Sequence, residues 1–360
     1  MPHAPHAIGF LAQCRAGFEA EAAQELAERA RSQHIAGRAS PAPRHGYVMF
    51  QIDDRVDWAT LQKAMDWRTL CFARQAWPVV AHLPALPERD RASPIADVLA
   101  AQRSAVGGVM LEYPDTNDGK ARSGFCKRFE APLGAALTRA GLLKADSRRL
   151  PRLHVFFPDA TQAWIGLSDP RLASDWPLGI PRLRMPREAP SRSTLKLAEA
   201  LLTLLDAEER ARWLRPGAKA VDLGAAPGGW SWQLASRGLR VTAIDNGAID
   251  AKLLAGGMVT HVRADGFVWK PRSAVDWMVC DMVEQPARIA ALVAEWLGKK
   301  HCRHAIFNLK LPMKKRHQAL QQCAAILTEK LAGVPLTLRF KQLYHDREEV
   351  TAYISRHDTR

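Results

Sequence analysis

The second half of the chain alternates short apolar runs with amphipathic segments. Residues 286–297 place apolar side chains at i, i+3, i+4, i+7 and i+8, which predicts a helix with one buried face. Gly298 follows and predicts the end of this helix. Residues 320–331 repeat this pattern. Strands that alternate with helices predict an α/β fold with a doubly wound, largely parallel sheet. The predicted strands are 220–223, 241–244, 259–262, 275–280 and 305–309, followed by 336–343 and 350–354 near a hairpin.

The first half reads as two smaller α+β groups. The first group has the order β-α-β-α-β, which predicts a ferredoxin-like module. Its elements are strands 8–14, 47–52 and 71–80 and helices 19–31 and 58–65. The second group follows a proline-rich stretch, and its elements are helices 95–104 and 132–143 and strands 108–113, 153–157 and 163–167.

A proline-rich stretch separates the two halves. Five prolines fall between Asp169 and Pro190, and proline restricts its neighbours and removes backbone donors, so an extended connector is predicted. We therefore expect four parts: a ferredoxin-like module at 1–82, a second module at 83–170, a linker at 171–190 and the α/β domain at 191–360.

The charge balance points to a polyanionic partner. The 360 residues include 51 Lys and Arg against 37 Asp and Glu, a formal net charge of +14. Such an excess favours nucleic acid first and an anionic membrane surface second, and it also fits a basic protein kept soluble by its charge. No apolar run of membrane-spanning length and no secretory signal is evident, so we expect no membrane partner.

The cysteine pattern indicates free thiols. The six cysteines are scattered at 14, 71, 126, 280, 302 and 323, and no two form a C-x-x-C pair. This spacing argues against a disulfide framework and a zinc knuckle and suits a cytoplasmic protein. His301 and His304 lack a further ligand set, so no metal site is predicted. Nothing in the sequence indicates an obligate protein partner.

One segment of the first half is strongly basic. Phe125 and Phe129 interleave with its basic residues, so the segment could bind phosphates and stack on bases, or be a solvated face whose phenylalanines lie in the core. Its acidic residues are Glu130 and Asp146. Its basic residues are Lys120, Arg122, Lys127, Arg128, Arg139, Lys144, Arg148, Arg149 and Arg152.

The strongest local motif is D-L-G-A-A-P-G-G-W at residues 222–230. A predicted strand ends at Leu223, a glycine-rich turn follows, and a helix begins near Trp230. Glycines allow a ligand to approach the backbone closely at the carboxyl end of a strand. The motif is neither the dinucleotide fingerprint nor a P-loop, which argues against an NAD oxidoreductase.

Charged residues recur where the following strands end. Asp245, Asp265 and Asp281 follow successive strands, and Lys310 ends the next one. A carboxylate after the second strand can accept both ribose hydroxyls of an adenosine ligand, although strand-end aspartates often only cap helices. Lys196 points away from the apolar stripe of its predicted helix, so it is either solvated or turned into the cleft.

Together these motifs resemble the FtsJ-type RNA 2′-O-ribose methyltransferases. The resemblance rests on S-R-S-T-L-K at 191–196, the glycine-rich motif, Asp281, Lys310 and E-V-T at 349–351. It implies a Rossmann-like S-adenosylmethionine-dependent domain with a Lys-Asp-Lys-Glu tetrad. The matching tetrad positions are Lys196, Asp281, Lys310 and Glu349. The implied cofactor-site residues are Ser193, Ala226, Pro227, Gly228, Gly229, Asp245, Asp265 and Asp281, with Asp245 at the ribose and Asp265 facing adenine.

Longer strings narrow the resemblance to one branch of that family. P-S-R-S-T-L-K-L, N-L-K-L-P-M-K-K-R and D-R-E-E-V-T resemble the bacterial 23S rRNA cytidine 2′-O-methyltransferases, whose N-terminal part is a ferredoxin-like module followed by a THUMP-type RNA-binding domain. The resemblance implies 23S rRNA, naked or precursor, as substrate.

Several alternatives stay open. A noncatalytic RNA-binding ribosome-assembly factor would explain the charge but not the tetrad, and another RNA could be the substrate. A base-directed amino-methyltransferase would need an Asn/Asp-Pro-Pro-aromatic string where residues 281–286 read D-M-V-E-Q-P. A 5-methylcytosine enzyme would need a catalytic thiolate, and Cys280 lies in what reads as a buried strand.

The implied chemistry requires alignment and removal of one proton. Lysine has a reference pKa of about 10.4, so only about one Lys310 in a thousand would be neutral near neutral pH. Burial and a nearby Lys196 ammonium would lower that pKa, and Asp281 would oppose them. We therefore expect Asp281 to orient Lys310 as the proton acceptor and Glu349 to balance Lys196. In the alternative, Lys310 stays charged and only steers the hydroxyl.

Overall fold

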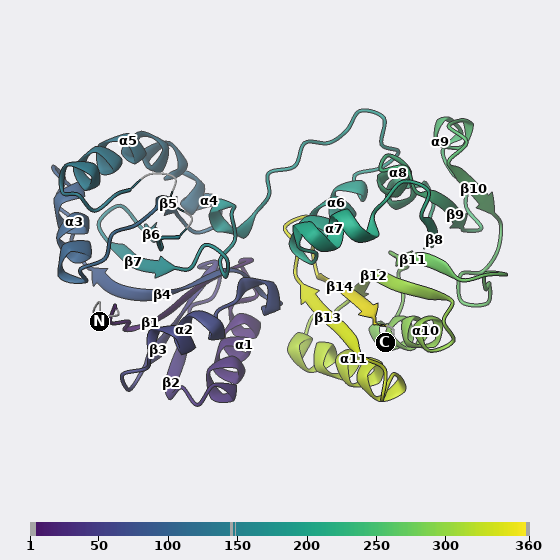
Figure 1. The fold of residues 1–360 in the computed structure, drawn as a ribbon, viewed down its shortest axis with the longest axis horizontal. Coiled ribbons are helices and arrows are strands. Elements are labelled where there is room, and N and C mark those ends of the chain that lie inside the picture. Colours follow the sequence, from purple (N-terminus) through teal and green to yellow (C-terminus); the bar gives the residue numbers. More distant parts are fainter. Residues whose placement is uncertain (1–4, 145–146, 148, 358–360) are drawn as a thin grey trace. The chain divides into compact units, whose positions relative to one another are not determined.

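The computed structural model describes residues 5–144, 147 and 149–357, which form two compact units that divide after Pro181. Each unit is built round one sheet of seven strands (Figure 1). The predicted α/β fold class, a doubly wound sheet preceded by α+β structure, is confirmed.

The N-terminal unit has the strand order β2-β3-β1-β4-β7-β6-β5. The long central strand β4 pairs antiparallel with β1 on one side and β7 on the other, so one continuous sheet runs through both predicted modules. Its strands are β1 Gly9–Cys14, β2 Gly37–Pro41, β3 Tyr47–Ile52, β4 Ala73–Leu83, β5 Gly108–Glu112, β6 Arg152–Phe156 and β7 Ala163–Ser168. Its helices are α1 Glu19–Ser32, α2 Trp58–Ala64, α3 Ala92–Ala101, α4 Asn117–Lys120 and α5 Ser123–Arg139, with short 3₁₀ turns at Trp67–Thr69 and Pro177–Gly179.

Strand β2 and helix α5 are the clearest differences between this unit and the sequence prediction. Strand β2 was not predicted, because it is an edge strand that pairs only with β3 and has no buried position to create a pattern. Helix α5 begins at Ser123 and not at Pro132, which lies inside it. Proline is most favourable in the first turn of a helix, so its position suggested a start that the chain does not use.

Part of the proline-rich stretch packs onto the N-terminal unit. Leu178 and Ile180 are buried, and the Leu178 N–H donates to Oε1 of the buried Glu112 at 2.7 Å. The polypeptide from Arg182 onward belongs to the second unit.

The C-terminal unit has the strand order β10-β9-β8-β11-β12-β14-β13. Strands β10, β9, β8, β11 and β12 are parallel, and β14 runs antiparallel between β12 and β13. The strands are β8 Lys219–Leu223, β9 Arg240–Ile244, β10 Val259–Val262, β11 Val275–Cys280, β12 Cys302–Lys310, β13 Leu336–Lys341 and β14 Glu349–Arg356. The helices are α6 Thr194–Thr203, α7 Ala207–Trp213, α8 Gly229–Ala235, α9 Ala251–Ala255, α10 Pro286–Gly298 and α11 Arg316–Lys330.

Helices cover both faces of this second sheet. Figure 1 shows α6, α7 and α8 on one side of it and α10 and α11 on the other. The chain leaves β8 toward β9 and β10 and then returns to β11 on the opposite side of β8, so the strand order reverses between β8 and β11. Ligands of open α/β sheets bind in the crevice outside the carboxyl ends of the strands at such a reversal.

Candidate active site

A cavity opens at the carboxyl ends of β8, β9, β10 and β11. Its volume is about 440 Å³, which lies within the usual range for small-molecule sites. Three strand-end aspartates predicted from the sequence, Asp245, Asp265 and Asp281, all line it. The complete lining is Gly224, Ala226, Ile244, Asp245, Asn246, Ala264, Asp265, Gly266, Phe267, Asp281, Met282, Val283 and Glu284.

The glycine-rich turn brings backbone to the edge of this cavity. Gly224 has φ +74°, and a Cβ there would lie 2.4 Å from Cγ of Met282, so only glycine fits this close approach. Gly229 begins α8, and a Cβ on it would lie 2.3 Å from the hydroxyl oxygens of both Ser191 and Ser193. The turn that follows β8 therefore packs closely against the segment that precedes α6.

The aspartates are held by backbone donors. Oδ2 of Asp245 accepts from the Ala226 N–H at 2.9 Å, and Oδ1 accepts from the Gly247 N–H at 2.7 Å. Oδ1 of Asp265 accepts from the Phe267 N–H at 2.8 Å. A carboxylate has about four lone-pair sites, so each can still accept from a ligand.

The predicted cofactor residues divide into two groups. Ala226, Asp245, Asp265 and Asp281 face the cavity. Ser193, Pro227, Gly228 and Gly229 lie outside its described lining and shape the turn behind it. Ser193, for example, accepts through its carbonyl from the indole N–H of the buried Trp230 at 3.0 Å.

Among the residues of the lining that sequence reasoning missed, four carry polar, aromatic or thioether side chains. They are Asn246, Phe267, Met282 and Glu284. Each lies within three residues of a strand-end aspartate, so their position in the chain was the available signal. The lining contains four carboxylates. Glu284 pairs with Arg288 and Asp281 pairs with two lysines, so Asp245 and Asp265 are the two whose negative charge suits a ligand bearing positive charge.

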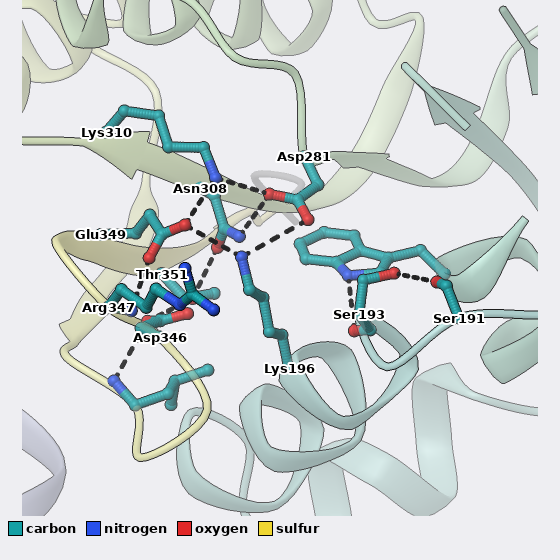
Figure 2. Close-up of polar contacts among 12 residues, drawn as sticks. Ser191, Ser193, Lys196, Asp281, Asn308, Lys310, Asp346, Arg347, Glu349 and Thr351 are labelled. Carbon is teal, nitrogen blue, oxygen red and sulfur yellow. Dashed lines mark hydrogen bonds and ion pairs between the residues drawn. The ribbon is translucent and has the colours of Figure 1, made fainter. Parts of the chain in front are cut away.

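The four predicted tetrad residues meet beside this cavity (Figure 2). Lys196 comes from α6, Asp281 follows β11, Lys310 ends β12 and Glu349 begins β14. The antiparallel register of β12 and β14 sets Lys310 opposite Glu349. Because Asp281 belongs to both the cavity lining and this cluster, the two sites are continuous.

Ion pairs connect all four side chains. Nζ of Lys310 lies 2.8 Å from Oε1 of Glu349 and 3.1 Å from Oδ1 of Asp281. Nζ of Lys196 lies 3.0 Å from the same Glu349 oxygen and 3.7 Å from Oδ2 of Asp281. Lys196 is thus turned into the cleft. Glu349 pairs with Lys196, as expected, and the same Oε1 also pairs with Lys310.

Electrostatics keep Lys310 protonated in the free protein. Burial lowers the pKa of Lys310, but the Asp281 and Glu349 carboxylates outweigh burial and leave it above the ordinary 10.5. Burial raises the pKa of Glu349, but the hydrogen bond from Lys310, a backbone donor at Arg347 and the charge of Lys196 together lower it to about 2. The predicted lowering of the Lys310 pKa by Lys196 is therefore outweighed in this state.

Cys280 is an inert core thiol. It is fully buried in β11, and burial raises the pKa of its thiol to about 12. All six cysteines are buried, and none of them forms a disulfide. A nucleophilic cysteine needs a depressed pKa and access, so this geometry opposes the 5-methylcytosine alternative.

In the basic segment of the N-terminal unit, the phenylalanines pack against the core and most of the basic side chains are exposed. Phe129 is buried, and Phe125 stacks on it with ring centroids 5.3 Å apart while packing against the same core. Both rings therefore contribute to the core, which agrees with one of the two interpretations of the sequence. The exposed basic side chains are Lys120, Lys127, Arg128, Arg139, Lys144 and Arg149, whereas Arg148 lies outside the described residues.

Three family models match successive parts of the chain. The RlmM ferredoxin-like domain matches residues 8–77, the N-terminal part of ribosomal RNA large subunit methyltransferase M matches 90–169, and the FtsJ-like methyltransferase matches 189–324.

Curated relatives match over nearly the whole length. The chain is 55% identical to ribosomal RNA large subunit methyltransferase M of Aromatoleum aromaticum, over 97% of this chain and 95% of that protein. It is 53% identical to the protein of that name from Azoarcus sp., over 96% of each, and 50% identical to that of Stenotrophomonas maltophilia, over 97% of each. Within the described residues, no helix combines the length and apolar character that crossing a membrane requires.

Proposed function

Because the chain belongs to the ribosomal RNA large subunit methyltransferase M family, we propose that it methylates the ribose 2′-hydroxyl of a cytidine in 23S rRNA, with S-adenosylmethionine as methyl donor. The observation that carries this proposal is the Lys196-Asp281-Lys310-Glu349 cluster, which shares Asp281 with a cavity of ligand size. A noncatalytic assembly factor would not require this cluster beside a ligand cavity.

The cavity fits the proposed methyl donor in chemistry. Asp245 would accept from the ribose hydroxyls, Asp265 and Phe267 would flank the adenine, and the Gly224 turn would leave room for the rest. When bound, S-adenosylmethionine supplies a methyl group already activated by its positive sulfonium. The negative lining attracts such a cation.

The residues of the cluster would align the ribose 2′-hydroxyl and remove its proton. We assign Lys310 as the acceptor of the 2′-hydroxyl proton, acting through its small neutral fraction. Asp281 and Glu349 hold the Lys310 ammonium by contacts at 3.1 and 2.8 Å, which fixes where the amine lies when it loses its proton. Lys196 is the neighbouring cation that favours this loss.

We propose further that the two N-terminal modules, 1–82 and 83–170, hold the RNA, and that the protein works in the cytoplasm. The support is the row of exposed basic side chains that includes Lys127 and Arg128 on α5. For single-stranded RNA, each phosphate contact contributes about −0.7 to the slope of log binding constant against log salt concentration. Lys127→Glu with Arg128→Glu in the full-length chain should weaken RNA binding and flatten that slope by about 1.4. An unchanged affinity and slope would refute RNA binding by this face.

Mass spectrometry tests the reaction itself. Unmodified 23S rRNA is incubated with the protein and S-adenosylmethionine, digested with nuclease and compared between wild type and Lys310→Ala. We expect one added ribose methyl, with its linkage resistant to alkali, in wild type and none in the variant. Lys299→Ala is the matched control, because this lysine pairs with Glu295 on the surface at the end of α10.

The other outcomes have defined meanings. A methyl on a base would refute ribose methylation, and methylation of a different RNA only would refute the 23S assignment. Full activity of Lys310→Ala would remove Lys310 from the mechanism. Absence of methyl transfer together with absence of cofactor binding would favour an assembly factor.

A further inference from the structure

A chain of buried polar groups runs behind the tetrad, from Asp281 through Asn308 and Thr351 to Asp346 (Figure 2). Nδ2 of Asn308 donates to Oδ1 of Asp281 at 2.7 Å. Oγ1 of Thr351 lies 2.6 Å from Oδ1 of Asn308 and 3.0 Å from Oδ2 of Asp346. Asn308 and Thr351 are fully buried and Asp346 is 1% exposed, so water does not substitute for any of these partners.

The number of protons fixes the direction of each hydrogen bond. The Asp281 carboxylate, between two lysine ammonium groups, only accepts, so Asn308 turns its amide N–H toward it. The Asn308 carbonyl oxygen then faces Thr351 and can only accept. Thr351 therefore donates its single hydroxyl proton to this oxygen. The remaining contact, between Thr351 and Asp346, has no proton left unless Asp346 supplies it.

The surroundings of Asp346 favour the neutral acid. The charged groups that face it are Lys196 and Glu199 from α6 and Glu349 from β14, one cation against two carboxylates. Burial, and after it Glu199 and Glu349, raise the pKa of Asp346 well above its ordinary value, and Lys196 and the Leu343 N–H only partly offset them. The Leu343 N–H donates to Oδ2 of Asp346 at 3.1 Å, which fixes the side chain in place.

We propose that Asp346 is a protonated acid that heads a one-way chain of donors, Asp346 to Thr351 to Asn308 to Asp281, and that this chain positions Asp281 for Lys310. No proton moves along the chain during the reaction. Asn308 and Thr351 are positioning residues, because they act on Lys310 only through Asp281. The proposal rests on the proposed function for its effect on the reaction, whereas the protonation state stands without it.

Neutrality at Asp346 also preserves the charge balance of the site. The tetrad contains two ammonium groups and two carboxylates. A third carboxylate at Asp346 would raise the pKa of the nearby lysines and hold their protons more tightly. A neutral acid supplies the hydrogen bond without that opposing charge.

Infrared difference spectroscopy reads the protonation state without RNA or methyl donor. Wild type minus Asp346→Asn, at a pH of about 8.5, should show the carbonyl stretch of a protonated carboxylic acid, although an ordinary aspartate with a pKa of about 3.9 would be ionised there. Asp222, whose pKa burial raises to about 7, cancels in the difference. Thr351→Val, which removes the acceptor of the acid proton, should shift the band to higher frequency. Absence of the band in wild type would overturn the proposal.

Kinetics of Thr351 variants test the positioning role. Valine keeps the branched shape of threonine but cannot donate to Asn308, whereas serine keeps the hydroxyl. We expect Thr351→Val to lower kcat about tenfold with the KM for S-adenosylmethionine within about twofold, and Thr351→Ser to recover most of kcat. Equal kcat for valine and serine variants would refute positioning through the hydroxyl. A missing infrared band with normal methyl transfer would refute this inference alone, and failure of methyl transfer in wild type would refute the proposed function alone.

Discussion

Replacing Glu349 with glutamine should change the pH dependence of methyl transfer in a way that identifies the base. In wild type the pKa of Lys310 lies above 10.5, so its neutral fraction rises about tenfold per pH unit below that value. If Lys310 accepts the 2′-hydroxyl proton, kcat/KM should rise by about one logarithmic unit per pH unit from about pH 7 to 9, with no plateau.

The structure sets the direction of the expected shift. Glu349 contacts the Lys310 ammonium at 2.8 Å, and an opposite charge at such a distance favours the protonated form and raises the pKa of Lys310. Lys310 keeps its contact with Asp281 at 3.1 Å in the variant, so the side chain remains held. The pKa of Lys310 should therefore fall in Glu349→Gln, and the pH profile of the variant should level off at a lower pH than that of wild type.

Single-turnover methyl transfer to a short RNA measures this effect while limiting alkaline cleavage of the substrate. Glu348→Gln is the matched control, because the Glu348 carboxylate pairs with Arg316 and is 53% exposed, and its profile should follow wild type. A wild-type rate that does not change with pH would show that Lys310 stays charged and steers the hydroxyl. A Glu349→Gln profile parallel to wild type would show that the titrating group is not Lys310.

Three further predictions concern the turn, acid stability and the buried thiol. Gly229→Ala should weaken S-adenosylmethionine binding by more than about tenfold in calorimetric titration, because its Cβ would overlap two serine hydroxyls, whereas Gly108→Ala meets open space and should bind normally. Burial lowers the pKa of His304 to about 3, so below about pH 6.5 the unfolded state binds a proton that the folded state excludes, and stability is lost as pH falls. Between about pH 6.5 and 5 this loss is about 2 kcal/mol, and urea unfolding at both pH values should show a smaller loss for His304→Gln; equal losses would contradict it. Cys280→Ser should retain methyl transfer, and complete loss in a folded, cofactor-binding variant would revive a thiolate mechanism.

The sequence predicted the elements that bury a regular pattern and missed those that do not. Strand β11 was predicted with its observed bounds, and its last four residues, 277–280, are all buried. Edge strand β2 escaped prediction because every one of its side chains is at least partly exposed. Phe125 and Phe129 lie on one face of α5 next to exposed basic residues, and periodicity alone did not decide whether that face meets core or RNA.

The candidate site shows the same division between local and long-range information. The strand-end aspartates could be placed from the sequence, because parallel strands end at one edge of a sheet. Lys196 could not, since nothing local distinguishes a solvated helical lysine from one that meets Glu349 across 153 positions of sequence. The sharing of one Glu349 oxygen by two lysines depends on the antiparallel register of β12 and β14, which the motif does not contain.

Asp281 explains why the cavity and the tetrad form one site. One residue of the carboxyl end of β11 both lines the cavity and holds two lysines, and Asn308 from the neighbouring strand fixes its Oδ1. A methyl donor in the cavity and a hydroxyl beside Lys310 would therefore be aligned by the same carboxylate. Such alignment is worth several kcal/mol in reactions of this kind, and it depends on placement to within about 1 Å. The reversal of strand order beside β11 creates the crevice, and the buried polar network behind Asp281 supplies the rigidity that the alignment needs.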